Sequence, residues 1–291
     1  MNSKHAIVTS LVGVDLSKKA RVIDGLSWLY KTWLTWNIKG EWDLIICLGS
    51  TSSALEPLIA ELFPYAKIKL VMVNPNWSLF PNSRVASAYE DKDLLEDLKK
   101  YDLLFRTDYN SMLTENLFKI DSLQKVLVGS GGWKLFSSKE DYIKTSSIFK
   151  ELSEEFSLNY WGYSGADDSI LGPADLVTTI LSSQASLSLV LLSRDYNWNK
   201  ALVHYYAMDI TLNAFTNNFT LHVGGLDIKP NMRCISYLDL QIKPWHMSDD
   251  GFKILEWFEN SESQKINKGI NKKFESIAEY AYAVASYELP K

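Results

Sequence analysis

Short apolar runs alternate with helical patterns along the first hundred residues. Four runs have the length of buried strands: residues 5–12, 43–48, 67–73 and 103–105. The segments between them have the spacing of amphipathic helices: residues 20–36, 52–62 and 85–100. Strands that alternate with helices in this way form a parallel sheet with helices on its faces. We therefore predict an α/β fold with a Rossmann-like, mostly parallel sheet.

The pattern is less regular after residue 128. Helical spacing predicts helices at residues 139–155, 173–183, 199–215, 248–259 and 274–287. Apolar runs predict further strands at residues 126–128, 187–192 and 233–242, and the polar segment 260–272 is expected to be a surface loop or a loose helix. No internal repeat divides the chain. We therefore predict one domain over residues 1–291, with a first half at 1–128 and a second half, ending in helices, at 129–291.

Composition narrows the class of protein. The 291 residues are 46% hydrophobic and 22% charged, which is ordinary for a globular protein with a buried core. The net charge of −5 gives no global positive field that would attract nucleic acid. No apolar run reaches the length of a membrane span, and the first residues lack the apolar core of a signal peptide. We expect a cytoplasmic protein in which Cys47, inside an apolar run, is a buried thiol.

The segment LLFRTDYNSML, residues 103–113, interrupts an apolar run with a carboxylate. Asp108 and Asn110 follow a predicted strand, and ligands of parallel sheets collect at the carboxyl ends of the strands. An acid and an amide on a tight turn can face one divalent cation, because such cations prefer oxygen ligands. An ordinary strand end with a polar turn is the alternative interpretation.

Two other segments carry candidate chemistry. Arg84 lies at the start of the helix predicted at 85–100, where free N–H groups and a guanidinium suit a phosphate; a surface ion pair is the alternative. Asp167 and Asp168 are adjacent acids that can raise one another's pKa, which suits a general base working near neutral pH. A solvated turn before the helix at 173–183 is the alternative for this pair.

Several motifs in order resemble a known family. The run YDLLFRTDYNSMLTE, followed by VGSGGW, resembles a glycosyltransferase-related domain of GT-A type found in viral and algal proteins. That domain has an Asp-x-Asp triplet after an Arg/Lys-Thr pair, followed by a glycine-rich stretch. Further matches are PNSRVAS before this run and ILGPADLV, VHYYAMDITLNAF and IKPWH after it. The resemblance covers residues 5–250 and implies the GT-A variant of the α/β fold.

This chain departs from the family pattern at two positions. Asn110 stands in place of the second acid of the triplet, and Glu115 in place of a proline. The segment IKPWH also resembles the Lys-Pro-Trp close of glycogenin-like transferases, in which the Lys binds the diphosphate and a nearby His the metal. Here His246 follows the Trp, and no His precedes Lys243. A His that caps the helix predicted at 248–259 is the alternative.

The resemblance implies a hexosyl- or pentosyltransferase that moves a sugar from a nucleotide-diphosphate donor to a glycan or small-molecule hydroxyl. The first half would bind the donor and the second half the acceptor, in the host cytoplasm if the protein is viral. Thr9 and Ser10 would hold the nucleotide base and ribose, unless they are only polar strand ends. The remaining roles fall to two groups. The implied diphosphate contacts are Arg84 and Lys243; the implied ligands of Mn²⁺ or Mg²⁺ are Asp108, Asn110 and His246.

Two further functions stay open. Phage-type enzymes glycosylate hydroxymethylated DNA bases, and the run KINKGINKK at 265–273 is a local basic segment that DNA could contact, although a solvated surface explains it as well. A GT-A-like protein that binds a nucleotide or a partner without turnover is the other alternative. Asn110 favours that alternative, because a neutral amide gives the cation no charge.

Overall fold

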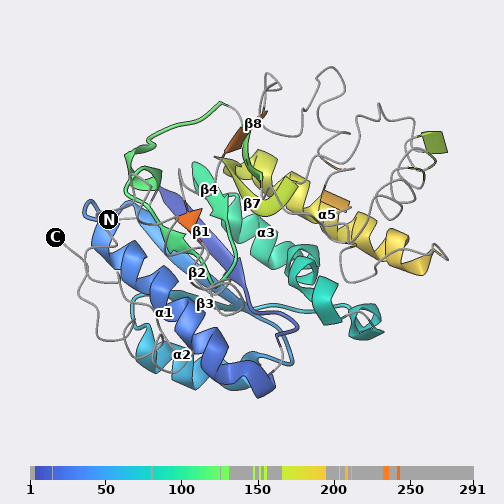
Figure 1. The fold of residues 1–291 in the computed structure, drawn as a ribbon, viewed down its shortest axis with the longest axis horizontal. Helices are drawn as coiled ribbons and strands as arrows, with labels where there is room; N and C mark the ends of the chain where they lie inside the picture. Colours follow the sequence, from blue (N-terminus) through green and yellow to red (C-terminus); the bar gives the residue numbers. More distant parts are fainter. Residues whose placement is uncertain are drawn as a thin grey trace, which may run out of the picture.

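The structure is a computed structural model, shown in Figure 1. It describes residues 4–14, 16–79, 81–124, 126–130, 166–194, 232–235 and 241–242, with eight further positions between 147 and 211. At 18, 78–79, 81–84, 128–130, 166–168, 232–235 and 241–242 it describes the backbone alone. The predicted helices at 248–259 and 274–287, and the segment 260–272, lie outside the described residues. At 139–155 and 199–215 only scattered positions are described.

A seven-stranded mixed sheet forms the centre of the described structure, in the order β3-β2-β1-β4-β7-β6-β8. Its strands are β1 (His5–Ser10), β2 (Trp42–Leu48), β3 (Lys67–Leu70), β4 (Leu103–Arg106), β6 (Val126–Ser130), β7 (Ala166–Pro173) and β8 (Met232–Ile235). The first four strands run parallel, β7 runs antiparallel to β4 and β6, and β8 runs parallel to β6. The predicted α/β class with a mostly parallel sheet is confirmed.

Helices cover both faces of this sheet (Figure 1). The α-helices are α1 (Lys19–Trp36), α2 (Glu56–Leu62), α3 (Lys92–Leu98) and α5 (Ala174–Ser193). The 3-10 segments are η1 (Leu16–Lys18), η2 (Ser53–Leu55), η3 (Pro75–Leu79), η4 (Pro81–Glu90) and η5 (Leu117–Lys119). A two-stranded pair, β5 (Met112–Leu113) and β9 (Gln241–Ile242), completes the described elements.

Two buried clusters show which helices cover which face. Alternate residues of a strand point to opposite faces, and β1 sends Ile7 into a cluster with α1 and α2, and Val8 into a cluster with α3, η4 and α5. The helix after β1 and the helix after β2 therefore lie on one face, and the helices after β3 and β7 lie on the other. Both clusters meet the central strands, so β1 and β4 are buried from both sides.

The change of face makes the boundary between β1 and β4 a topological switch point. The chain steps outward from β1 to β2 and β3, then returns across the sheet to place β4 on the other side of β1. Open α/β sheets bind ligands at the carboxyl ends of the strands beside such a point, because the crossover segments separate there and leave a crevice. Ser10, the last residue of β1, and the segment after Arg106 lie at this position.

Three predicted elements have different bounds in the structure. The strand predicted at 187–192 is wrong: these residues continue α5, and short apolar runs do not separate a strand from a buried helix. The helix predicted at 85–100 divides at Asp91, whose extended backbone ends η4 and whose carboxylate accepts a hydrogen bond from the Leu94 N–H to start α3. The run predicted as one strand at 233–242 contains the separate strands β8 and β9.

α5 is the one helix among the described residues that is long and apolar enough to cross a membrane by length and composition. Half of its most apolar window is buried inside the protein. Val177, Ile180 and Leu181 belong to the cluster that α5 forms with β4 and η4. Such burial is typical of the core helix of a globular domain, in which an apolar helix covers a sheet.

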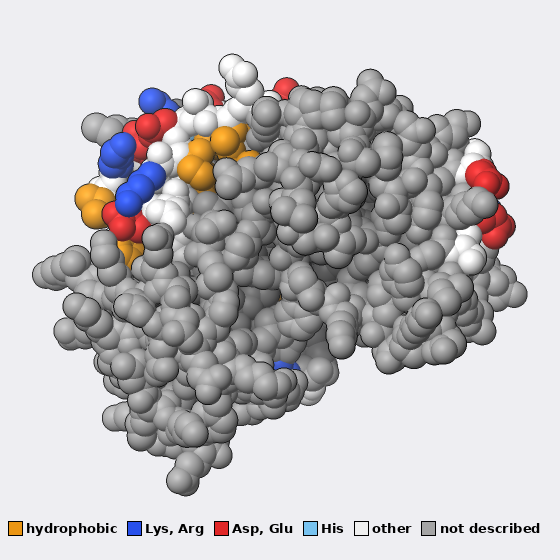
Figure 2. Space-filling view, turned by 45° about the horizontal axis from the view of Figure 1, so that its top comes forward, with side chains coloured by type: hydrophobic (Ala, Val, Ile, Leu, Met, Phe, Trp, Pro, Cys, Tyr) orange, Lys and Arg blue, Asp and Glu red, His pale blue; other side chains and the backbone are white. Residues whose placement is uncertain are grey.

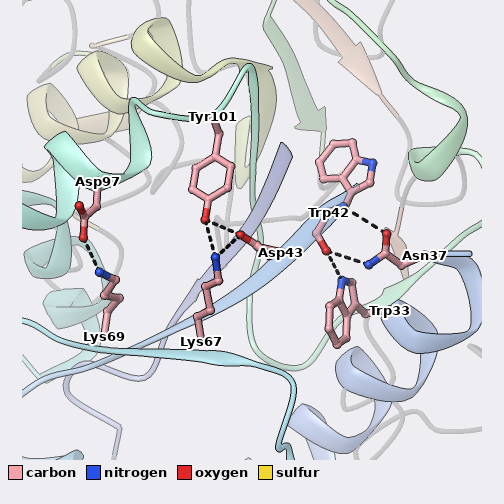
Figure 3. A network of polar contacts seen from close by, with 8 residues as sticks. All are labelled: Trp33, Asn37, Trp42, Asp43, Lys67, Lys69, Asp97 and Tyr101. Carbon is pink, nitrogen blue, oxygen red and sulfur yellow. Dashed lines mark hydrogen bonds and ion pairs between the residues drawn. The ribbon is translucent and has the colours of Figure 1, made fainter. Parts of the chain in front are cut away.

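Polar contacts join the outer strands to the helices beside them (Figure 3). The Trp42 carbonyl accepts hydrogen bonds from Trp33 Nε1 at 2.9 Å and Asn37 Nδ2 at 2.8 Å, which ties the end of α1 to the start of β2. The Tyr101 hydroxyl donates to Asp43 at 2.6 Å, and burial raises the pKa of that hydroxyl well above its ordinary value. These contacts fix the amino ends of β2 and β4, away from the switch point.

Candidate functional site

The segment after β4 is held against β1 by short polar contacts. The Thr107 N–H donates to the Val8 carbonyl at 3.0 Å, which extends the β1–β4 pairing by one residue. The Thr107 and Ser111 hydroxyls lie 2.9 Å apart and close the turn between them. Asp108 lies inside this turn with its side chain 21% exposed. The prediction that a strand ends just before Asp108 is confirmed, and its carboxylate lies at the switch point.

Arg106 is the second charged residue of this segment. Its side chain is 2% exposed, and Nη1 lies 3.3 Å from Asp108 Oδ1. A buried guanidinium needs a nearby negative charge, because an isolated buried charge is costly. Asp108 therefore supplies part of the charge balance of Arg106, and the ion pair also holds the carboxylate at the end of β4.

Asn110 is buried rather than displayed on the surface. The residue is 2% exposed, and its Oδ1 has no hydrogen-bond partner among the described residues. Asn110 lies against α1: a Cβ placed on Gly25 would be 3.0 Å from Asn110 Cβ and 3.1 Å from Asn110 Cα. A buried amide oxygen without a partner is costly unless a ligand, cation or water completes it.

Thr9 and Ser10 end β1 as predicted, and both are buried. Ser10 Oγ accepts a hydrogen bond from the Val12 N–H at 3.2 Å, which suits a polar strand end. Thr9 Oγ1 has no hydrogen-bond partner among the described residues. Thr9 is thus a second buried oxygen beside the switch point. Its contact with a nucleotide stays a prediction.

Asp167 and Asp168 lie in β7, so the alternative of a turn before the next helix is wrong. The β4–β7 pairing ends at Arg106 opposite Ile170. Asp108 is two residues beyond Arg106, and Asp168 is two residues before Ile170. The fold therefore brings both acidic segments to the same edge of the sheet, although 60 residues separate them in the chain (168 − 108 = 60).

The pairing of β5 with β9 brings a further motif near this edge. The strands are antiparallel, with Ile242 opposite Met112 and Gln241 opposite Leu113. From Gln241 to Ile242 the chain therefore runs in the direction from Leu113 back toward Asn110. Lys243 is the next residue of the chain. Lys243 and His246 themselves lie outside the described residues, and for Arg84 only the backbone, in η4, is described. The predicted diphosphate contacts and the third metal ligand stay predictions.

Asp108 and Asn110 are the residues at this edge that could offer oxygen atoms to a divalent cation. No group of three or more His, Cys, Asp or Glu side chains forms a metal site among the described residues. Mg²⁺-type sites often use one or two protein oxygens and complete the shell with phosphates and water. Asp108 offers a partly exposed carboxylate, and Asn110 offers a buried oxygen without a partner in the described part of the chain.

Four residues of β4 and α1 were not singled out from the sequence. Arg106 and Thr32 were read as parts of a strand and a helix, and Gly25 lay inside a helical pattern where a glycine has no evident role. Asp24, beside Gly25 on α1, has its pKa raised to about 6 by burial. Such a shift is typical of acids in functional clefts. A glycine inside an amphipathic helix is the signal that points to close packing.

Other surface features of the described residues lie elsewhere. An aromatic groove lined by Trp36, Trp42 and Phe118 lies at the amino end of β2, at the far end of the sheet from Asp108. On the face drawn in Figure 2, the described Lys and Arg side chains at the upper left are interspersed with Asp and Glu. The described residues of that face thus form no extended positive surface of the kind that binds DNA.

Comparisons with known proteins give the chain no family. No protein-family model matches it, and no curated protein sequence matches it. Mouse xyloside xylosyltransferase 1 in its apo form is a solved structure with a TM-score of 0.43 and 9% identity, covering 82% of this chain and 86% of its own. Galactosyltransferase LgtC with donor and acceptor sugar analogs has a TM-score of 0.41 and 11% identity, covering 80% of this chain and 73% of its own. TM-scores below 0.5 assign neither a family nor an activity.

Proposed function

We propose that this protein is a glycosyltransferase of GT-A type that uses a nucleotide-diphosphate sugar. The observation that carries the proposal is the register of β4 and β7, which places Asp108 and Asp168 two residues beyond the last paired residues of adjacent strands. β1 adds Thr9 and Ser10 to the same edge. Segments from both halves of the chain therefore meet beside the switch point, where α/β sheets bind ligands.

The donor half of this site would be formed by residues 1–128. Thr9 and Ser10 would contact the nucleotide, and Arg84 and Lys243 the diphosphate. Asp108 and Asn110, with His246, would hold Mn²⁺ or Mg²⁺. The cation would supply positive charge that stabilises the leaving diphosphate. Arg106 would hold the Asp108 carboxylate in place, through the 3.3 Å contact between them.

The acceptor half would supply the general base. Asp167 or Asp168 would take the proton of the acceptor hydroxyl while that oxygen attacks the anomeric carbon of the sugar. The bond between the anomeric carbon and the diphosphate oxygen breaks in the same step, and the diphosphate leaves with the electron pair. The products are the glycosylated acceptor and a nucleoside diphosphate. Both hexoses and pentoses are compatible with this chemistry.

A non-catalytic nucleotide-binding protein is the second candidate function. The ion pair between Arg106 and Asp108 favours it, because a guanidinium beside the carboxylate offsets the negative charge that a cation needs. Binding without turnover would then use the same edge of the sheet. DNA as the acceptor is a third reading, and salt-dependent binding to duplex DNA tests it directly.

A screen of nucleotide-diphosphate sugars tests the proposal. Thermal shift with Mn²⁺ or Mg²⁺ detects donor binding, since a ligand at a hundredfold excess over its Kd stabilises by about 2.7 kcal/mol. Mass spectrometry of the products then detects donor hydrolysis or transfer. Asp108→Ala should abolish turnover, whereas Asp102→Ala, an exposed acid beside the other end of β4, should not. If no donor binds, or if Asp108→Ala keeps wild-type turnover, the proposal is wrong; binding without turnover favours the second candidate.

A further inference from the structure

Gly25 gives α1 a position without a side chain where the candidate site meets it. Gly25 lies inside a helix of 18 residues and is buried. A Cβ at this position would lie 3.0 Å from Asn110 Cβ, 3.1 Å from Asn110 Cα and 3.1 Å from Tyr109 Cδ2. Contacts this short are rare for real Cβ atoms, and one of them is to backbone, which cannot turn aside. Helix propensity would favour alanine over glycine at this position. The close approach of Asn110 explains the glycine instead, because a side chain would not fit.

Thr32 makes the second contact between α1 and the same segment. Its Oγ1 accepts a hydrogen bond from the Leu113 N–H at 3.0 Å, and the hydroxyl lies 2.8 Å from the Trp28 carbonyl, to which it donates. Thr32 is buried, so the Leu113 N–H obtains this partner inside the protein. The contact joins residues 81 positions apart in the chain.

The two contacts have matching spacings. Gly25 and Thr32 are seven residues apart, which is about 10.5 Å along an α-helix at 1.5 Å per residue. Asn110 and Leu113 are three residues apart, which is about 10 Å in an extended chain at 3.3 Å per residue. The segment from Asn110, at the end of the turn, to Leu113 in β5 is therefore held against α1 at both ends, by close packing at Asn110 and by a hydrogen bond at Leu113.

We propose that Gly25 and Thr32 are positioning residues that set the place of the Asp108–Asn110 turn relative to the sheet. This inference rests on the proposed function, in which the turn holds the donor and its cation. A side chain at position 25 pushes Tyr109 and Asn110 outward by a few tenths of an ångström. Such a shift is a large part of the tolerance of about 0.5 Å within which oxygen ligands must be held for productive geometry. α1 then acts on donor binding without touching the donor.

Hydrogen exchange tests the contacts without any ligand. In Thr32→Val the Leu113 amide loses its acceptor, so its exchange should be faster than in wild type, and Thr32→Ser should restore protection. Thr35→Val is the matched control, because the Thr35 hydroxyl bonds only to the Lys31 carbonyl of its own helix in the described structure. Unchanged protection of the Leu113 amide in Thr32→Val would overturn the inference, whatever the protein binds.

Donor affinity tests the role of the contacts. Gly25→Ala and Thr32→Val should each weaken binding of a nucleotide-diphosphate sugar by about tenfold, since misplacement of about 1 Å can cost a hundredfold. Ser27→Ala, on the same helix, and Thr32→Ser should bind the donor as wild type does. If the wild type binds a donor and both variants bind it equally well, the inference is wrong. If the wild type binds no donor, the proposed function fails, and the exchange experiment decides the structural part alone.

Discussion

Arg106 and Asp108 form an ion pair across the end of β4, with Nη1 3.3 Å from Oδ1. The arginine is 2% exposed and the aspartate 21% exposed, so one partner is buried and the other reaches solvent. The two residues have the same i, i+2 spacing as Asp108 and Asn110. Asp108 thus balances the charge of a buried arginine and also presents a partly exposed carboxylate at the candidate site.

Replacement of Arg106 by Met should separate these two roles. The loss of a buried partner should lower the free energy of unfolding by about 2 to 4 kcal/mol, measured by urea unfolding. The apparent dissociation constant of Mn²⁺ in donor-binding assays should fall, because no guanidinium then offsets the negative charge of Asp108. Lys119→Met breaks an exposed pair with Glu115 at 3.2 Å and should cost less than about 1 kcal/mol. A stability loss no larger than this control would show that the Arg106 pair is unimportant.

Asp24 should make stability depend on pH. Burial raises the pKa of its carboxyl from 3.8 to about 6 in the folded protein. The folded state keeps this proton between pH 4 and 6 while the unfolded state loses it, so stability falls as pH rises through that window and the full cost is present above pH 6. Asp24→Asn should therefore stabilise the protein at pH 7 by about 1 to 2 kcal/mol, after allowance for partial exposure.

Urea unfolding at pH 7 and near pH 3.5 measures this difference. The gain from Asp24→Asn should vanish near pH 3.5, where the wild-type carboxyl is protonated in both states. Asp121→Asn, at an exposed position, is the control for the loss of one negative charge. A gain of equal size at both pH values would mean that the substitution acts through packing rather than ionisation.

Hydrophobic periodicity predicted the parallel part of the fold well. The strand–helix alternation over residues 5–105 fixes four parallel strands, because each crossover helix buries its apolar face on the sheet. The position of Asp108 after a strand followed directly. The antiparallel strand β7 did not: residues 166–173 contain two acids, a serine and a glycine, and they lack the alternating pattern of a strand.

The contacts that shape the candidate site depend on residues far apart in the chain. The register of β4 with β7 pairs Arg106 with Ile170, and no local pattern specifies that pairing. Gly25 and Asn110 meet only after α1 has packed on the sheet. The error at 187–192 has a different cause, because this short run is almost entirely apolar and periodicity alone does not separate a strand from a buried helix segment in such a run.

Asn110 should weaken the dependence on a divalent cation without removing it. An amide gives oxygen to the ion but no charge, and hard cations gain affinity from ligand charge. Asn110→Asp should lower the apparent dissociation constant of the metal ion in donor-binding assays, and His246→Ala should raise it. Mn²⁺ should activate better than Mg²⁺ if an imidazole is a ligand. Full activity in excess EDTA, unchanged in both variants, would show that the site works without metal.

Only one of the two acids in β7 should act as the general base. Ile170 belongs to the cluster on the α5 face and Leu171 to the cluster on the α1 face, so β7 alternates between the two sides of the sheet. The backbone of β7 continues through Asp168 and Asp167, and its pairing with β6 shifts register in this stretch, between Val128 and Ser130. Successive residues of a strand usually point to opposite faces of its sheet, so we expect one of the two acids, rather than both, to act on a single acceptor position.

Asp167→Asn and Asp168→Asn should consequently have unequal effects. The substitution of the base should lower kcat by about a hundredfold or more while donor binding, measured by thermal shift, persists. The other substitution should leave kcat within a few-fold of wild type, because that carboxylate would not contact the acceptor hydroxyl. Asp175→Asn, an exposed acid in the first turn of α5, is the control for the loss of one negative charge. Equal and mild effects of both β7 substitutions would exclude the pair as the base and leave proton transfer to a group from another element.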